Sequence, residues 1–221
     1  MTQTEKAVLI VGDQRLELPI LVGTHGERAV DITRLRDLTG LVTYDPSLSN
    51  TAITQSAITY IDGDRGILRY RGIPIEQFTE KPNFIEVAYL LIFGHLPNKT
   101  ELSQFSEALT ENELLHEGLT RQFDHIPLDA PPMAILSATL SHLACYHQEF
   151  LKVEDPESFL AVAARLISKV RTIAAFSYRR SQGLPFIYPD PHLRYCANFL
   201  HMMFSLPYKQ YIVTPEIEDA L

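Results

Sequence analysis

The sequence predicts a mainly α-helical protein, in which a small N-terminal β-strand region precedes a larger helical domain. Between residues 7 and 72, apolar and polar residues alternate at period two in several short runs, whereas from Ile75 onward apolar residues recur at the 3.6-residue period of a helix. The 221 residues are 46% apolar and 21% charged, which is ordinary for a folded globular chain. We therefore expect a strand region over 1–72 and a helical region over 73–221.

The strand region is predicted from three runs, AVLIVG, RLELPILVG and AITYIDG, which have Gly, Asp and Pro between them. After the third run comes the tetrapeptide Gly63-Asp64-Arg65-Gly66, whose glycines tolerate a positive φ and so favour a hairpin turn. Pro74 stands where a short helix could begin, because proline suits the first helical position.

The first helices are predicted by stripes of apolar residues that recur every three or four positions. Asn98 followed by Glu101 is the pattern of a capping box, so one helix should begin there. The expected buried stripes are Val87, Leu90 and Leu91; Leu102, Phe105 and Leu109; and Leu115, Leu119 and Phe123. Short connections between these helices favour antiparallel neighbours.

Two longer helices are expected over 131–150 and 155–182, with Gly183 ending the second. Both are apolar around much of their circumference. The first carries a stripe of small residues: Ala134, Ser137, Ala138, Ser141 and Cys145. Such a stripe lets another helix approach closely, which fits either a central helix or a subunit interface.

A last complete helix is expected from Pro191 to about Phe204, after which a polar linker leads to Thr214 and Pro215. Thr214 suits a helix N-cap and Pro215 the first helical position. Only about seven residues remain, and isolated helices shorter than about 12 residues are marginal in water. We expect the sequence to stop within an element at Leu221.

Charge and composition exclude several classes of protein. The net charge of −8 and a pI near 5.5 argue against binding to a phosphate backbone. The first twenty residues have neither a signal-peptide core nor a membrane span, so we expect a cytoplasmic protein. Cys145 and Cys196 lie in apolar surroundings, which predicts burial rather than a disulfide or a zinc site. The eight histidines include no HxxxH pair, so no metal site is expected.

A family resemblance rests on IDGDRGILRYRG at Ile61 to Gly72 and on NFIEVAYLLIFGHLP from Asn83. This block closely resembles the "DGDxGxLxxRG" and "NFxEVxYLLxxGxLP" signature of citrate synthases. Further similarity lies in YRRSQGLPFIYP and in the "NFLxMMF" match over 198–204. The resemblance as a whole runs from about Val8 to the final residue. The resemblance implies the first part of a large helical domain, with the family's small domain outside this chain.

The activity that the resemblance implies is condensation of acetyl-CoA with oxaloacetate to citrate and CoA, the first step of the tricarboxylic acid cycle. Family members use an Asp and two His residues for this acyl transfer, and arginines grip oxaloacetate. All these groups lie beyond the position that matches Leu221, so no catalytic residue and no bound cofactor are expected here. Turn and surface roles are expected for the charged signature residues Asp62, Asp64, Arg69 and Arg71. The resemblance also implies a homodimer through helices 131–150 and 155–182, with hexamers or larger bodies as further options.

A hexameric bacterial subgroup of the family has an inhibitory NADH site, and its tyrosine, arginine and lysine match Tyr146, Arg165 and Lys169. The same site uses an Arg-His pair where this sequence has Glu111 and Asn112, followed by Glu113. Acidic groups facing a pyrophosphate would repel it, so we expect a vestigial nucleotide effector site. The alternative is that Arg165 and Lys169 form an exposed i, i+4 pair.

Two other functions share this sequence pattern. The chain could be a non-catalytic module that dimerises through residues 131–182 without turning over substrate. It could instead belong to a 2-methylcitrate synthase, which differs in the acyl pocket, a part of the fold outside this segment. Turnover of acetyl-CoA with oxaloacetate separates the first alternative from an enzyme.

Overall fold

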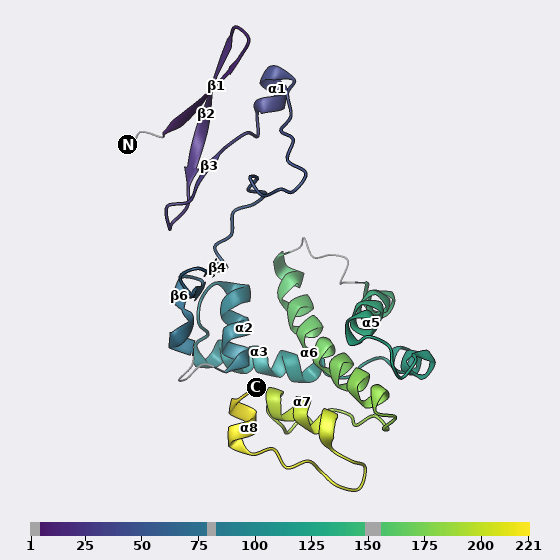
Figure 1. The fold of residues 1–221 in the computed structure, drawn as a ribbon. Coiled ribbons are helices and arrows are strands. Elements are labelled where there is room, and N and C mark those ends of the chain that lie inside the picture. Colours follow the sequence, from purple (N-terminus) through teal and green to yellow (C-terminus); the bar gives the residue numbers. More distant parts are fainter. Residues whose placement is uncertain (1–4, 79–82, 149–155) are drawn as a thin grey trace. The chain divides into compact units, whose positions relative to one another are not determined.

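The computed structural model describes residues 5–78, 83–148 and 156–221, and the described chain is mainly helical, as predicted (Figure 1). The chain forms two compact units, Met1–Ser56 and Ala57–Leu221. The described residues include no helix that is long and apolar enough to cross a membrane.

The first unit contains an antiparallel three-stranded sheet of order β1-β2-β3. Its elements are β1 (Lys6–Val11), β2 (Gln14–Val22), β3 (Arg28–Val30) and the short helix α1 (Leu35–Thr39). The β1–β2 register runs from Lys6 opposite Pro19 to Val11 opposite Gln14, and Gly12 takes the positive φ (58°) that the tight turn needs. The strands confirm the period-two prediction, whereas α1 was not predicted.

The second unit begins with a small sheet made of β4 (Thr59–Asp62), β5 (Ile67–Tyr70) and β6 (Ile73–Pro74), followed by the 3₁₀ helix η1 (Ile75–Phe78). The predicted hairpin turn lies between β4 and β5, where Gly66 has φ +65° and the Arg65 N–H donates to Asp62 Oδ1 at 3.0 Å. Arg71 also takes a positive φ (49°), and its Nη2 donates to the Leu91 carbonyl at 2.6 Å. Asp62 and Arg71 therefore have the structural roles expected of them.

The rest of the second unit is helical (Figure 1). Its helices are α2 (Phe84–Phe93), α3 (Lys99–Glu111), α4 (Glu117–Thr120), the 3₁₀ helix η2 (Arg121–His125), α5 (Pro132–Tyr146), α6 (Pro156–Ser181), α7 (Tyr195–Phe204) and α8 (Pro215–Asp219). The longest helix, α6, contacts α3, α5 and α7, so it is the element on which the domain is assembled.

Capping explains where two of the helices begin. Asn98 accepts from the backbone N–H of Glu101, and the Glu101 carboxylate accepts from the Asn98 N–H, which confirms the predicted capping box of α3. An equivalent box between Asn83 and Glu86 opens α2 and was not predicted. At the end of α6, Gly183 has φ +64° and confirms the predicted stop.

Two apolar clusters form the core of the second unit. One joins α4, η2, α5 and α6 through Leu115, Leu119, Phe123, Ile135, Leu143, Ile173 and Phe176. The other joins α2, α3 and α6 through Tyr89, Phe105, Leu109 and Ala164. The predicted stripe of Leu115, Leu119 and Phe123 is buried, although it spans a coil residue, α4 and η2 rather than one helix.

Two predicted helix boundaries need correction. α7 begins at Tyr195 rather than Pro191, because the Asp190 carboxylate accepts from the His192 N–H and its carbonyl accepts from the Leu193 N–H, which makes a turn. α5 ends at Tyr146 rather than at 150. The last two predicted residues of that helix, 149–150, and residue 155 of the next lie outside the described residues.

The small-residue stripe of α5 faces solvent within this chain. Ala134, Ser137, Ala138, Ser141 and Cys145 are all exposed. The prediction that Cys145 is buried is therefore wrong, because its helix packs on α6 through another face, with Ile135, Thr139 and Leu143 buried. Cys196 is half-buried.

Candidate functional site

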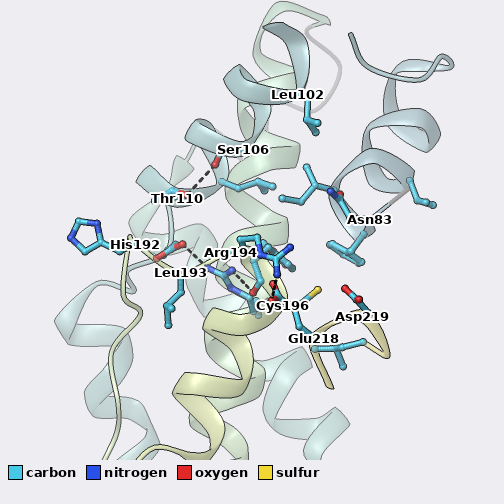
Figure 2. Close-up of a pocket in the computed structure, with 18 of the residues that line it drawn as sticks. Asn83, Leu102, Ser106, Thr110, His192, Leu193, Arg194, Cys196, Glu218 and Asp219 are labelled. Carbon is cyan, nitrogen blue, oxygen red and sulfur yellow. Dashed lines mark hydrogen bonds and ion pairs between the residues drawn. The ribbon is translucent and has the colours of Figure 1, made fainter. Parts of the chain in front are cut away.

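A groove of about 910 Å³ lies in the second unit between the helices α2 and α3 on one side and α7 and α8 on the other (Figure 2). Polar and apolar residues line it in similar proportion, and its ionisable groups come from four separate segments. The apolar lining consists of Phe84, Ile85, Val87, Leu102, Leu109, Leu193, Ala220 and Leu221. The ionisable lining consists of Glu113, Arg171, His192, Arg194, Tyr195, Cys196, Glu218 and Asp219.

A buried ion pair forms part of the groove lining. Arg171 Nη2 lies 2.8 Å from Glu113 Oε1, and the two side chains are only 3% and 5% exposed. The Asn198 amide lies 3.2 and 3.1 Å from the two Glu113 oxygens, to which it donates. The charge of Glu113 is thus satisfied from α6 and from α7 at once.

Tyr195 completes this arrangement. The Arg171 guanidinium lies over the Tyr195 ring, 4.1 Å from its centroid, and Nη1 donates to the Tyr195 carbonyl at 2.9 Å. Burial raises the pKa of the Tyr195 phenol to about 12, although the Arg171 charge opposes the shift. Tyr195 is therefore a neutral hydrogen-bond donor at physiological pH, and its hydroxyl donates to the Ile167 carbonyl at 3.1 Å.

Helix α6 holds Glu113 in place by binding the backbone of residues 109–114. Ser168 Oγ donates to the Leu109 carbonyl, and Thr172 Oγ1 donates to the Glu113 carbonyl at 2.8 Å. Both hydroxyls come from buried positions of α6. The carbonyls left over at the end of α3 thus find donors on α6.

The rim of the groove is polar. Arg194 Nη2 forms an ion pair with the Glu218 carboxylate, which joins the start of α7 to α8. The pKa of the Cys196 thiol is raised, first by burial and then by the Glu218 charge, so this thiol is a weak nucleophile at neutral pH. Among the residues that the structure describes, no three His, Cys, Asp or Glu side chains lie close enough to hold a metal ion.

Two of the predicted effector residues, Arg165 and Lys169, meet at Asn112. Arg165 Nε donates to Asn112 Oδ1 at 2.9 Å, whereas Lys169 Nζ donates to the carbonyls of Leu114 at 2.7 Å and Asn112 at 3.3 Å. Lys169 is only 4% exposed. The alternative of an exposed Arg165–Lys169 pair is therefore wrong for Lys169, because its ammonium binds backbone carbonyls of the segment after α3.

The third predicted effector residue, Tyr146, lies beside His116 and Gly118, in the later part of the segment that follows α3. Its ring stacks on His116 with centroids 4.3 Å apart, and a Cβ on Gly118 would lie 2.5 Å from its hydroxyl oxygen. The His116 Nδ1 accepts from the Gly118 N–H at 3.0 Å. All three residues thus contact the stretch from Asn112 to Gly118, and their nucleotide role stays a prediction.

Glu113 does not lie where it was expected. Glu113, expected to face a bound pyrophosphate, is instead buried against Arg171, whereas Glu111 is exposed. The carboxylate of Glu113 is turned inward because α6 supplies a cation for it there.

The network of Glu113, Arg171 and Asn198 was missed by sequence reasoning, because Glu113 and Asn198 are 85 positions apart. One signal was available: Arg171 interrupts an otherwise apolar and small-residue face of the helix in the run SKVRTIAAF. A charge at a position whose helical neighbours are buried indicates a buried partner.

The family model described as "Citrate synthase, C-terminal domain" matches residues 47–221. The chain is 44% identical over 206 residues to Citrate synthase 1 of Mycobacterium tuberculosis, in strain CDC 1551 / Oshkosh and in strain H37Rv. The match covers 93% of this chain and 48% of either relative, so the chain spans about half the length of the curated relatives it matches.

Solved structures agree with the sequence relatives. The chain is similar to citrate synthase from Pyrobaculum aerophilum (TM-score 0.66, 30% identity, 84% of this chain and 44% of that one). It is similar to the enzyme from Thermotoga maritima (TM-score 0.64, 31% identity, 80% and 44%). A third neighbour is the Thermoplasma acidophilum citrate synthase in a ternary complex with carboxymethyl coenzyme A and oxaloacetate (TM-score 0.71, 26% identity, 79% and 44%).

Proposed function

This chain belongs to the citrate synthase family, and from that premise we propose that the complete protein condenses acetyl-CoA with oxaloacetate to give citrate and CoA. The observation that carries the proposal is the 44% identity to a citrate synthase over 93% of this chain. The solved neighbour from Thermoplasma acidophilum holds a coenzyme A derivative and oxaloacetate, which supports the same pair of substrates here. The proposed reaction needs no further cofactor, and the proposed location is the cytoplasm.

The described half contributes the scaffold of this enzyme. The condensation needs a base that takes a methyl proton from acetyl-CoA and a donor that stabilises the developing enolate. In the groove, Glu113 is already paired with Arg171, and the Cys196 thiol has a raised pKa. We propose that the catalytic groups lie outside these 221 residues and that the helices packed around α6 position them.

A spectrophotometric assay of CoA thiol release tests the reaction. The natural protein, with whatever residues follow Leu221 in its gene, should release CoA from acetyl-CoA only when oxaloacetate is present. Propionyl-CoA in place of acetyl-CoA tests the 2-methylcitrate alternative. A higher kcat/KM for propionyl-CoA than for acetyl-CoA would assign the protein to 2-methylcitrate synthesis. If neither thioester released CoA, the result would support the alternative of a non-catalytic assembly module.

The proposed assembly is a homodimer through α5 and α6, with further association into hexamers as an option. Its support is the exposed stripe of small residues on α5, together with Met133, which is 72% exposed. Small side chains allow a second helix to approach closely, and an isologous contact repeats the same stripe on both subunits.

The proposed nucleotide effector role of Tyr146, Arg165 and Lys169 is vestigial. Arg165 and Lys169 already donate to Asn112 and Leu114, so a bound nucleotide would have to replace these bonds. Equilibrium dialysis with NADH tests this role. If NADH binds and the Lys169→Met variant does not bind it, these residues form a working effector site and not a vestigial one.

A further inference from the structure

We propose that His116 makes a pH-sensitive contact between α4 and α5. With its ring neutral, His116 holds the first turn of α4 and stacks on Tyr146, the last residue of α5. Uptake of a proton by the ring breaks its bond to α4. The contact lies outside the groove and does not depend on the proposed function.

The hydrogen bond between His116 and Gly118 fixes the protonation state of the ring. The backbone N–H of Gly118 can only donate, so Nδ1, which lies 3.0 Å from it, is the acceptor and carries no proton. By contrast, His95, His142 and His201 face side-chain oxygens that can accept, and a protonated ring still donates to them. Protonation therefore costs His116 a bond that these three histidines keep.

This bond caps a very short helix. His116 is the N-cap residue of α4, which has only four residues. Helices of this length are not stable alone, because nucleation is costly. The N–H groups of Leu119 and Thr120 donate to the His116 carbonyl at 2.8 and 3.0 Å, and both side chains are buried. Loss of the cap weakens the turn that places these two residues in the core.

The other side of the contact is the Tyr146 ring. The two rings stack with centroids 4.3 Å apart and an interplanar angle of 27°. A Cβ on Gly118 would lie 2.5 Å from the Tyr146 hydroxyl oxygen and 3.1 Å from His116 Nδ1, so the three groups meet only because this residue is glycine. A protonated imidazole can still lie on a tyrosine face. What protonation removes is the bond to Gly118, where one N–H would face another.

The surroundings do not stabilise a protonated ring at this position. The titratable groups around the contact are Glu117 of α4, Tyr146 and His142 of α5, Lys169 of α6, and Tyr188. The Glu117 carboxylate accepts from the Tyr188 hydroxyl at 3.3 Å. The Lys169 ammonium binds the backbone of the same segment, so a second cation nearby is disfavoured.

Hydrogen–deuterium exchange of the natural protein, followed by peptide mass spectrometry, measures the contact. The contribution of a bond to a neutral imidazole is present at high pH and is lost as the pH falls through the range of about 5 to 8. After correction for the intrinsic exchange rate, the protection of peptides that contain Gly118 should fall by about fivefold between about pH 8 and pH 5.5, the effect of losing one ordinary hydrogen bond. Protection of α6 peptides should not change.

A matched pair of variants assigns the effect to one ring. Asparagine also caps a helix through its side-chain oxygen but takes up no proton, so His116→Asn should keep its protection at both pH values. His125→Asn, at an exposed position of η2, should show the same fall as the parent.

Three results overturn the proposal: equal protection of the parent at both pH values, the same fall in His116→Asn as in the parent, or an equal fall in the α6 peptides. The last result would assign the change to unfolding of the whole unit. If His116→Asn does not fold, the comparison of Gly118 and α6 peptides in the parent decides the question.

Discussion

The guanidinium of Arg171 lies 2.8 Å from the carboxylate of Glu113, and only 3% and 5% of the two side chains are exposed. The pair joins the middle of α6 to the segment that follows α3, and Asn198 of α7 binds the same carboxylate. Helices α6 and α7 and the segment after α3, which lie far apart in the sequence, are thus joined at one point. We expect the packing of the second unit to depend on this ion pair.

Replacing Arg171 with Met leaves the Glu113 carboxylate buried without its cation. We expect the free energy of unfolding to fall by about 3–5 kcal/mol, because an unpaired buried charge keeps its full desolvation penalty. The double variant Glu113→Leu/Arg171→Met should lose less than the sum of the two single variants. Urea unfolding measures all three, and Glu111→Gln on the exposed end of α3 is the control. A loss below about 1 kcal/mol for Arg171→Met would mean that the pair is dispensable.

Arg179 is the largest fully buried side chain among the described residues, and it donates to the carbonyls of Pro185, Met203 and Ser205. Arg179→Leu should destabilise the second unit by about 3 kcal/mol or more, because three carbonyls, of which that of Ser205 is buried, lose their donor. Thermal unfolding followed by circular dichroism measures the loss. The control Gln182→Ala, at an exposed position just beyond α6, should change the melting temperature little. Equal effects of the two changes would contradict this role for Arg179.

The capping box of α3 should make stability depend on pH. The hydrogen bond from the Asn98 N–H lowers the pKa of Glu101 below its ordinary value of 4.5, so its contribution is present above that pH and is lost as the pH falls through the lowered pKa. In Glu101→Gln, the fall in unfolding free energy below pH 4.5 should be shallower than in the parent. Urea unfolding at several pH values measures the slope. Glu107→Gln is the control on the same helix, and an identical slope in the parent and Glu101→Gln would refute the assignment.

The α5 stripe should carry the subunit contact. Ala138→Arg places a long charged side chain on the exposed small-residue face, and sedimentation velocity should show that it converts the proposed dimer to a monomer. Ser103→Arg, at an exposed position of α3, should leave the sedimentation coefficient unchanged. A dimer that survives Ala138→Arg would place the contact elsewhere.

Sequence periodicity predicted the elements whose stabilising contacts are local. The capping box of Asn98 and Glu101, the helix stop at Gly183 and the hairpin turn before Ile67 are all set by residues a few positions apart, and all three are confirmed. The start of α7 was misplaced because the Asx turn of Asp190 competes with the helix signal of Pro191.

Sequence periodicity could not predict contacts between residues that are far apart in the sequence. Burial of Lys169 depends on the carbonyls of Asn112 and Leu114, which a helical pattern does not specify. Exposure of Cys145 depends on which face of α5 meets α6, and an all-round apolar helix does not determine that face. The family match named Tyr146, Arg165 and Lys169, which do not line the groove, and the sequence could not show that Glu113 turns toward Arg171.

The claim at the centre of this account is that these 221 residues supply a frame and no reacting group. The direct test is CoA release from acetyl-CoA and oxaloacetate by a purified polypeptide whose mass shows that it ends at Leu221, assayed beside the natural protein. We expect release from the natural protein and a rate for the 221-residue polypeptide equal to that of buffer. Citrate formed by the 221-residue polypeptide alone would contradict the account.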